Sequence, residues 1–200
     1  MSISPAPPYA KFADLEREAL ACMRCPLAAT RTQVVFGAGD PQADLMFVGE
    51  GPGEQEDATG VPFVGRAGQL LTTLIEGIGL SRAEVYIANV VKCRPPGNRD
   101  PQPLEIESCR PYLEAQVGFI RPRVIVTLGN FATKLLLQTK VGITKLRGQE
   151  FAYGTGVVLI PTLHPSAVLR TGGRNIADSR ADFVVAKRAL ARAATVGAEG

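Results

Sequence analysis

Four stretches of the chain are predominantly apolar and short enough to be buried β-strands. They show little alternation between apolar and polar positions, which is typical of strands covered on both faces, as in a parallel sheet. The predicted strands are residues 45–48, 85–91, 123–128 and 157–160. Residues 31–44 indicate a loop or a short irregular strand, and residues 142–153 indicate a turn with a short strand.

Between these strands, apolar residues recur every three to four positions, the spacing of one face of an α-helix. The predicted helices are residues 12–22, 66–78, 103–120, 129–138 and 178–194. Pro111 and Gly118 are weak points in the third of them. Strands that alternate with helices indicate an α/β fold with a parallel sheet covered on both sides. We expect one domain over residues 12–194, with flexible tails at residues 1–11 and 195–200.

The composition is that of a cytosolic globular protein. A chain of 200 residues with 46% hydrophobic content can bury a full core. No apolar run approaches the roughly 20 residues of a membrane helix. The proline-rich N-terminus also lacks the basic-then-apolar order of a signal peptide. We therefore expect a cytoplasmic monomer that does not enter membranes.

The charge is divided unevenly along the chain. Residues 1–120 carry 10 Lys+Arg against 15 Asp+Glu, a balance of −5, whereas residues 121–200 carry 12 against 4, a balance of +8, which together give +3. This asymmetry predicts one basic face. Such a face is compatible with nucleic-acid binding, but a basic patch alone is equally compatible with an unevenly charged soluble protein.

Glycine and polar residues stand at the ends of three predicted strands. The first strand runs into GEGPGE at residues 49–54, whose glycines let a ligand approach the main chain. Asn89 lies near the end of the second strand, and His164, the only histidine, follows the fourth. Ligands of open parallel sheets bind at the carboxyl ends of the strands. The pattern favours a ligand site at these strand ends. For residues 49–54, the glycine turn, the alternative is an ordinary strand-to-helix connection with an acidic edge.

Three of the candidate residues each allow two interpretations. The Asn89 amide either bonds to a neighbouring backbone or matches the imide edge of a pyrimidine. A single histidine is more often structural than catalytic, but the rigid backbone before Pro165 and the strand-end position favour a ligand role for His164. Phe63, in a glycine-flanked loop, is either a core residue or the stacking wall of a base pocket.

The four cysteines indicate metal or redox chemistry, because disulfides are rare in cytosolic proteins. Two of them form a C-x2-C pair, 67 residues separate this pair from the third, and 15 residues separate the third from the fourth. The second pair is too wide for a zinc ribbon. Four thiolates are still compatible with zinc or with an iron-sulfur cluster, and unrelated buried thiols are the remaining alternative.

Four motifs in this order resemble the family 4 uracil-DNA glycosylases. They are GEGPGE at residues 49–54, PFVG at 62–65, NVVKCRPP at 89–96 and HPSAVLR at 164–170. The resemblance extends from about residue 22 to residue 188 and includes the four cysteines. It implies a four-stranded parallel sheet between helices, in three α/β/α layers, and the excision of uracil from DNA by a monofunctional enzyme. It also implies a 4Fe-4S cluster on Cys22, Cys25, Cys93 and Cys109.

The same resemblance implies roles for individual residues. Phe63 would stack on the flipped uracil, Asn89 would read its edge, and His164 would contact its O2 oxygen. A neutral imidazole suffices for that contact, because one hydrogen bond to O2 stabilises the departing base. Glu50 is the candidate for positioning water or balancing charge on the sugar, although Glu54, Glu56 and Asp57 lie in the same loop.

The remaining assignments concern the base pocket and the duplex. Backbone groups around Gly51 are expected to hold the pyrimidine. Ser166, Leu169 and Arg170 form a candidate wedge, in which Leu169 fills the gap left by the base and Arg170 holds a phosphate. The basic residues after position 120 then serve DNA binding.

Three alternatives to uracil excision with turnover make different predictions. Related glycosylases that become trapped on DNA carry a nucleophilic histidine in a loop after the second strand, and residues 93–99 contain no histidine, so we predict turnover without trapping. A metal-stabilised module that binds nucleic acid without catalysis predicts DNA affinity but no uracil release. A nucleotide-phosphate loop is disfavoured, because the glycines lack the G-x-G-x-x-G spacing and no Walker lysine follows.

Overall fold

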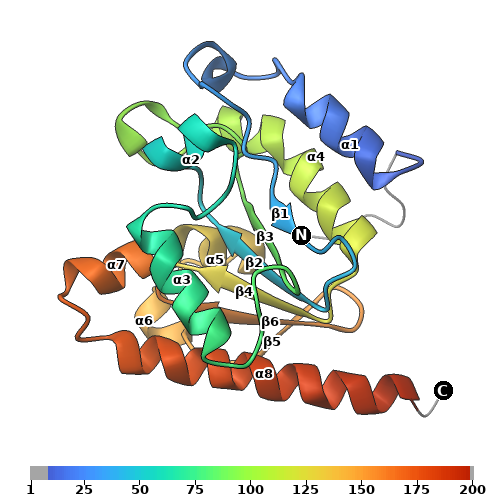
Figure 1. Cartoon of the computed structure of the whole chain (residues 1–200), viewed down its shortest axis with the longest axis vertical. Helices are drawn as coiled ribbons and strands as arrows, with labels where there is room; N and C mark the ends of the chain where they lie inside the picture. Colours follow the sequence, from blue (N-terminus) through green and yellow to red (C-terminus); the bar gives the residue numbers. More distant parts are fainter. Residues whose placement is uncertain (1–8, 199–200) are drawn as a thin grey trace.

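The structure, a computed structural model, describes residues 9–198, and within them the chain forms one mixed sheet between two layers of helices (Figure 1). The sheet has six strands in the order β1-β3-β2-β4-β6-β5. Their bounds are β1 Ala38–Gly39, β2 Leu45–Gly49, β3 Tyr86–Asn89, β4 Val124–Leu128, β5 Phe151–Tyr153 and β6 Val157–Thr162.

The four central strands β3, β2, β4 and β6 are mutually parallel, as the apolar stretches predict. The four-stranded sheet that the resemblance implies is too small, because β1 and β5 each pair antiparallel with a neighbour at the two edges. Both fall in the segments where a short strand was expected. They contain two and three residues, too few for alternation to distinguish them from a loop. The second predicted strand is also shorter than expected, since β3 ends at Asn89.

The helices lie on both faces of the sheet, so the three-layer architecture is confirmed. The α-helices are α1 Phe12–Leu20, α2 Glu54–Thr59, α3 Arg66–Glu76, α4 Pro103–Ile120, α5 Asn130–Leu137, α6 Ile143–Leu146, α7 Pro165–Arg170 and α8 Ile176–Ala198. The described residues also form two short 3-10 helices, η1 Pro26–Ala29 and η2 Pro96–Asn98. Helix α4 is continuous through Pro111 and Gly118, and α8 continues four residues beyond the predicted end at residue 194.

Alternate residues of each central strand supply two separate cores. Met46 and Val48 of β2 pack with residues of α1, α4 and α5 on one face. Leu45 and Phe47 pack on the other face with α3 and α8, where the ring of Phe47 stacks on that of Phe183 at 5.3 Å. Burial on both faces explains why these strands are continuously apolar. Within the described residues, none of the helices combines the length and the apolar character that crossing a membrane requires.

The parallel arrangement brings four strand ends to one edge of the sheet. Gly49 pairs with Asn89 at the ends of β2 and β3, and Leu128 pairs with Thr162 at the ends of β4 and β6. The glycine turn, the loop after Asn89 and the segment that begins at His164 therefore leave the sheet on the same side.

Candidate active site

A cavity of about 970 Å³ lies at this carboxyl edge of the sheet. Its walls come from the loops after β2, β3, β4 and β6, together with α7. Of the residues predicted from the sequence, the lining includes Glu50, Gly51, Phe63, Asn89, His164, Ser166 and Arg170. Leu169 is partly buried on α7 and is not among the residues that line the cavity.

Gly49, the last residue of β2, allows two pocket side chains to approach the main chain closely. A Cβ atom at Gly49 would lie 2.4 Å from Asn89 Oδ1 and 2.7 Å from the Phe63 ring. At Gly51 a Cβ would lie 2.8 Å from Val91. The glycines therefore create room for neighbouring side chains as well as for a ligand, which the sequence interpretation did not foresee.

Phe63 is held in an unusual backbone conformation. Its φ angle of 53° lies in the left-handed region, which a bulky aromatic residue rarely adopts. Arg82 fixes the loop by donating to the Phe63 carbonyl at 3.2 Å and to the Pro62 carbonyl at 2.7 Å. The Phe63 ring centre lies 5.8 Å from that of His164, with a 34° angle between the planes. A strained residue held this firmly is a common feature of ligand sites.

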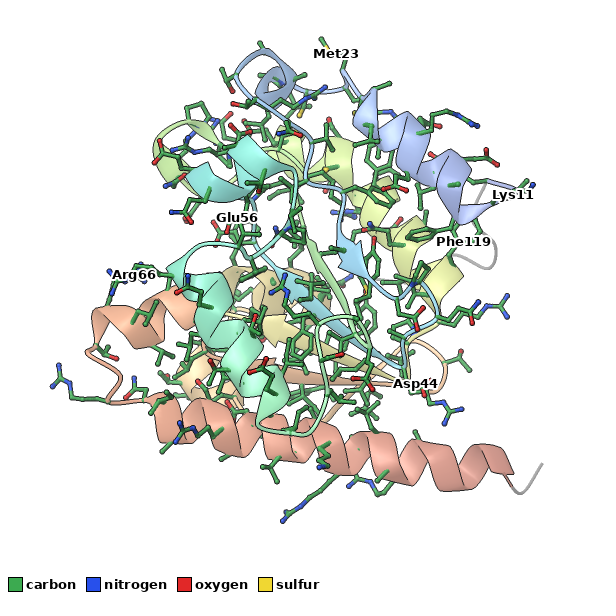
Figure 2. The ribbon with its side chains drawn as sticks, viewed as in Figure 1. Lys11, Met23, Asp44, Glu56, Arg66 and Phe119 are labelled. Atoms are coloured by element: carbon green, nitrogen blue, oxygen red, sulfur yellow. The ribbon has the colours of Figure 1, made fainter. Side chains whose placement is uncertain are left out.

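Glu56 supports the same loop from the neighbouring helix. Its carboxylate accepts hydrogen bonds from the backbone N–H groups of Val64 at 2.9 Å and Gly65 at 3.0 Å. Figure 2 shows Glu56 on the side of α2 that faces α3. The same carboxylate accepts a hydrogen bond from the Gly53 N–H at 3.1 Å, so it joins the glycine turn to the Phe63 loop.

Asn89 presents an unpaired acceptor in the cavity wall. Its side chain is 1% exposed, and Oδ1 has no hydrogen-bond partner within the described part of the chain. Buried amide oxygens are nearly always paired, because losing water without a replacement costs about 1–3 kcal/mol. The position of Asn89 at the end of β3 is itself fixed, since the following N–H of Val90 donates to the Gly49 carbonyl at 2.9 Å. Asn89 thus lines the cavity with an oxygen that has no partner among the described residues.

His164 lies two residues after the end of β6 and caps the N-terminus of α7. Its Nδ1 accepts a hydrogen bond from the Ser166 N–H at 3.1 Å and lies 2.7 Å from Ser166 Oγ. Burial, with a smaller contribution from the positive charge of Arg170, lowers the pKa of His164 to about 4. The imidazole is therefore neutral at pH 7, and its hydrogen-bond pattern places the proton on Nε2.

Glu50 has a partner that the sequence interpretation missed. Burial, together with the negative charge of Asp100 and a hydrogen bond between the two carboxyl groups, raises the pKa of Glu50 to about 7. Asp100 is held in place by its neighbour, because Arg99 donates to the Asp100 carbonyl at 2.9 Å and to the buried Glu105 carboxylate at 2.6 Å. No local signal marks Asp100, since its approach to Glu50 depends on the path of the loop after β3.

The three acidic residues expected in the same loop as Glu50 lie instead on α2 and are engaged elsewhere. Glu54 is 80% exposed and lies 3.9 Å from Arg94. Asp57 is buried and accepts a hydrogen bond from the Thr32 N–H at 2.9 Å. Glu56 binds backbone, as described above. Among these acidic residues, Glu50 alone has a carboxyl group paired with another carboxyl group in the cavity.

Comparison with known proteins identifies the family. The sequence profile of the Uracil DNA glycosylase superfamily matches residues 36–191. The chain is 53% identical over 150 residues to a type-4 uracil-DNA glycosylase of Thermotoga maritima, a match that covers 74% of this chain and 78% of the relative. The chain belongs to the type-4 uracil-DNA glycosylases. The family resemblance seen in the sequence motifs is thus confirmed.

Two further type-4 relatives support the membership. The enzyme of Sulfurisphaera tokodaii is 48% identical over 164 residues, or 78% of this chain and 74% of the relative. That of Archaeoglobus fulgidus is 46% identical over 163 residues, or 78% of this chain and 82% of the relative. A type-5 uracil-DNA glycosylase of Thermus thermophilus is more distant, at 33% identity and 62% of this chain.

In this type-4 family member, the four cysteines line one small cavity apart from the base pocket. Cys22 and Cys25 lie between α1 and η1, Cys93 follows β3, and Cys109 lies on α4. Two sulfurs already accept hydrogen bonds: Cys109 from the Lys92 N–H at 3.2 Å, and Cys93 from Arg31 at 3.6 Å. Burial raises the pKa of Cys93 to about 11. Among the described residues, no three ligand side chains are arranged to hold a single metal ion.

Proposed function

We propose that this protein flips uracil out of DNA and hydrolyses its N-glycosidic bond, leaving free uracil and an abasic site. The observation that carries the proposal is the buried, unpaired Asn89 Oδ1 in the cavity wall. The Asn89 amide offers an acceptor beside a donor, which complements the N3–H and O4 groups of uracil. Membership of the type-4 family supports the same reaction.

The cavity residues divide the reaction between them. Phe63 stacks on the flipped base, and the backbone around Gly51 holds the pyrimidine. Cleavage leaves negative charge on the base, and the Nε2–H of neutral His164 donates to O2 to stabilise it. Glu50, as a carboxylate, positions the attacking water or balances the positive charge on the sugar. Cytosine presents the opposite hydrogen-bond pattern to Asn89, and the methyl group of thymine meets the pocket wall.

An oligonucleotide with a single uracil tests this function. Incubation followed by alkali is expected to break the strand at the uracil position, since an abasic site is labile to base. The same oligonucleotide with thymine in place of uracil is the control and stays intact. DNA binding without strand scission would instead support a non-catalytic binding module.

Helix α7 is the proposed contact with the rest of the DNA. Ser166 and the exposed Arg170 border the cavity, and Leu169 lies between them on the same short helix. Arg170 pairs with a phosphate, and Leu169 fills the space that the flipped base vacates. Because α7 begins at Pro165, directly after His164, contact with the duplex and contact with the base are made by one continuous segment.

The activity is expected to depend on the protonation of Glu50. Its carboxylate form is the active one, and the pKa near 7 means that kcat/KM rises with pH through about 7 and falls roughly tenfold per unit well below it. Asp100→Asn removes the neighbouring negative charge but not the burial, so the acid limb is expected to shift to lower pH. The measurement is kcat/KM against pH for both proteins.

Glu54→Gln is the control for this profile, because Glu54 is an exposed carboxylate at the start of α2, four positions after Glu50. Its profile is expected to match that of the wild type. An acid limb that stays at the same pH in Asp100→Asn, or that moves to higher pH, would contradict the assignment of Glu50.

We further propose that Cys22, Cys25, Cys93 and Cys109 hold a 4Fe-4S cluster. The four sulfurs line one cavity, and a cluster of several irons spaces its sulfur ligands more widely than a single ion does. Hydrogen bonds to the sulfurs of Cys93 and Cys109 match the donor environment of such clusters. When bound, the cluster supplies a cross-link between α1, the end of β3 and α4.

The cluster predicts a brown protein with broad visible absorption and about four irons per chain. Cys109→Ser is expected to lose most of the iron and the colour, because one thiolate ligand is removed. Ser108→Ala, which changes the adjacent residue in the same cavity, is the control and keeps both. A colourless wild-type protein loaded with zinc would contradict this assignment.

We also propose that the protein works as a monomer in the cytoplasm. None of the four cysteines forms a disulfide, as expected in a reducing compartment.

A further inference from the structure

A buried lysine connects the cysteine cavity to the base pocket. Lys92 is 2% exposed, and it stands between Asn89, at the base pocket, and Cys93, at the cysteine cavity. Its backbone N–H donates to Cys109 Sγ at 3.2 Å. Its ammonium group donates to the Asn89 carbonyl at 2.8 Å and to Gln116 Oε1 at 2.5 Å. One residue therefore contacts both sites.

The two acceptors of the ammonium group are neutral. Gln116 is oriented by its own contacts, since Nε2 donates to the Phe36 carbonyl at 2.8 Å and to the Tyr86 hydroxyl at 3.2 Å. Its oxygen must therefore face Lys92. Within the described part of the chain, Lys92 forms no salt bridge with a carboxylate. A buried charge without a counter-charge is strongly unfavourable.

Lys92 lines the same cavity as the four cysteines. It directly precedes Cys93 in the chain, and its backbone N–H is bonded to the sulfur of Cys109. Four thiolates around an iron-sulfur core leave a net negative charge, which needs compensation in a buried site. Arg31, partly buried, also donates to Cys93. Lys92 is the fully buried cation next to this centre.

We propose that Lys92 is the buried counter-charge of the four-cysteine centre and, through its hydrogen bond to the Asn89 carbonyl, a positioning residue for the side chain that reads uracil. The inference rests on the proposed function, because it takes the cluster and the Asn89 contact from it. It adds a physical link between the two sites: the charge that balances the cluster also fixes the end of β3.

Two substitutions separate the charge from the hydrogen bond. Lys92→Met keeps the length of the side chain but removes both, whereas Lys92→Gln removes the charge and retains a neutral donor. Lys187→Met, an exposed lysine on α8, is the matched control. The two readouts are the reduction potential of the cluster and the affinity for free uracil by titration calorimetry, and neither requires turnover.

Loss of a nearby positive charge makes a cluster harder to reduce. Both Lys92 variants are therefore expected to have a more negative potential than Lys187→Met. Uracil affinity is expected to fall about tenfold in Lys92→Met and about threefold in Lys92→Gln. If Lys92→Met does not fold, Lys92→Gln still supplies both readouts.

The controls separate this inference from the proposed function. If the wild-type protein contains no iron-sulfur cluster, the proposed cluster site is wrong, and so is the role of Lys92 as its counter-charge. If the wild-type protein does not bind uracil, the proposed base pocket is wrong. If the wild type holds the cluster and binds uracil, a Lys92 variant with the potential and affinity of Lys187→Met overturns the role of Lys92 alone.

Discussion

Replacing His164 with alanine is expected to lower the rate of uracil release about 100- to 1000-fold, the usual effect of removing one donor to a developing anion. The imidazole accepts at Nδ1 from Ser166 and is neutral, so its Nε2–H is the donor for O2 of the departing base. Alanine provides no donor at this position. The measurement is the single-turnover rate on DNA containing one uracil, with enzyme in excess so that binding does not limit the reaction.

The pH dependence of the wild type distinguishes a neutral from a charged histidine. With a pKa of about 4, His164 stays neutral throughout the range where Glu50 is ionised. The activity is therefore not expected to fall as pH rises through 6.5. A decline over that range, absent from His164→Ala, would identify a charged histidine, and a wild-type rate in folded His164→Ala would eliminate the residue from the reaction. Thermal unfolding of both proteins checks that the variant is folded.

Replacing Asn89 is the second change with a large expected effect. Asn89→Ala is expected to lower kcat/KM on uracil about 100-fold or more, because the N3–H and O4 groups of the base lose both partners in the pocket. The geometry supports this magnitude, since the buried Oδ1 has no other partner in the described residues. Parallel assays on uracil and cytosine in the same sequence context measure the effect and the discrimination together.

Asn89→Asp is the matched variant, because it keeps the shape of the side chain and replaces its donor with an acceptor. It is expected to lose uracil activity as Asn89→Ala does, and to weaken the preference for uracil over cytosine, whose N4 group is a donor. If Asn89→Asp keeps both the rate and the preference of the wild type, the amide does not read the base.

The four central strands and the longer helices that cover them were predictable, because each is long enough to show its characteristic pattern of apolar residues. Residues 45–48 are buried on both faces, and their apolar run indicates a parallel strand directly. Strands β1 and β5 are too short for such a signal. Helix α7 was read as a wedge segment, although Pro165 at its first turn is a typical helix start.

The candidate site was predictable where it depends on strand ends. Asn89 and His164 end up at one cavity because the strands that precede them are parallel. Asp100 and Lys92 were not predictable in this way. The contact of Asp100 with Glu50 depends on the path of a loop that Arg99 holds through its bond to Glu105. Lys92 follows an apolar run in the sequence, and only the structure shows that its ammonium group donates to two neutral acceptors.

The role of Glu50 shows what the structure adds to a motif. In the sequence, Glu50, Glu54, Glu56 and Asp57 are equivalent carboxylates of one loop. Their contacts differ: Glu56 and Asp57 bind backbone N–H groups, Glu54 faces solvent, and Glu50 pairs with Asp100 in the cavity. Burial and the neighbouring charge then give Glu50 a pKa suited to work near pH 7.

The most direct test of the account is the amount of free uracil released per enzyme from DNA that carries an excess of uracil sites. We expect several uracil molecules per enzyme, one abasic site for each, and intact strands until alkali is added. Failure to release any uracil would contradict the proposed glycosylase activity, and release that stops at one molecule per enzyme, with protein attached to the DNA, would contradict turnover.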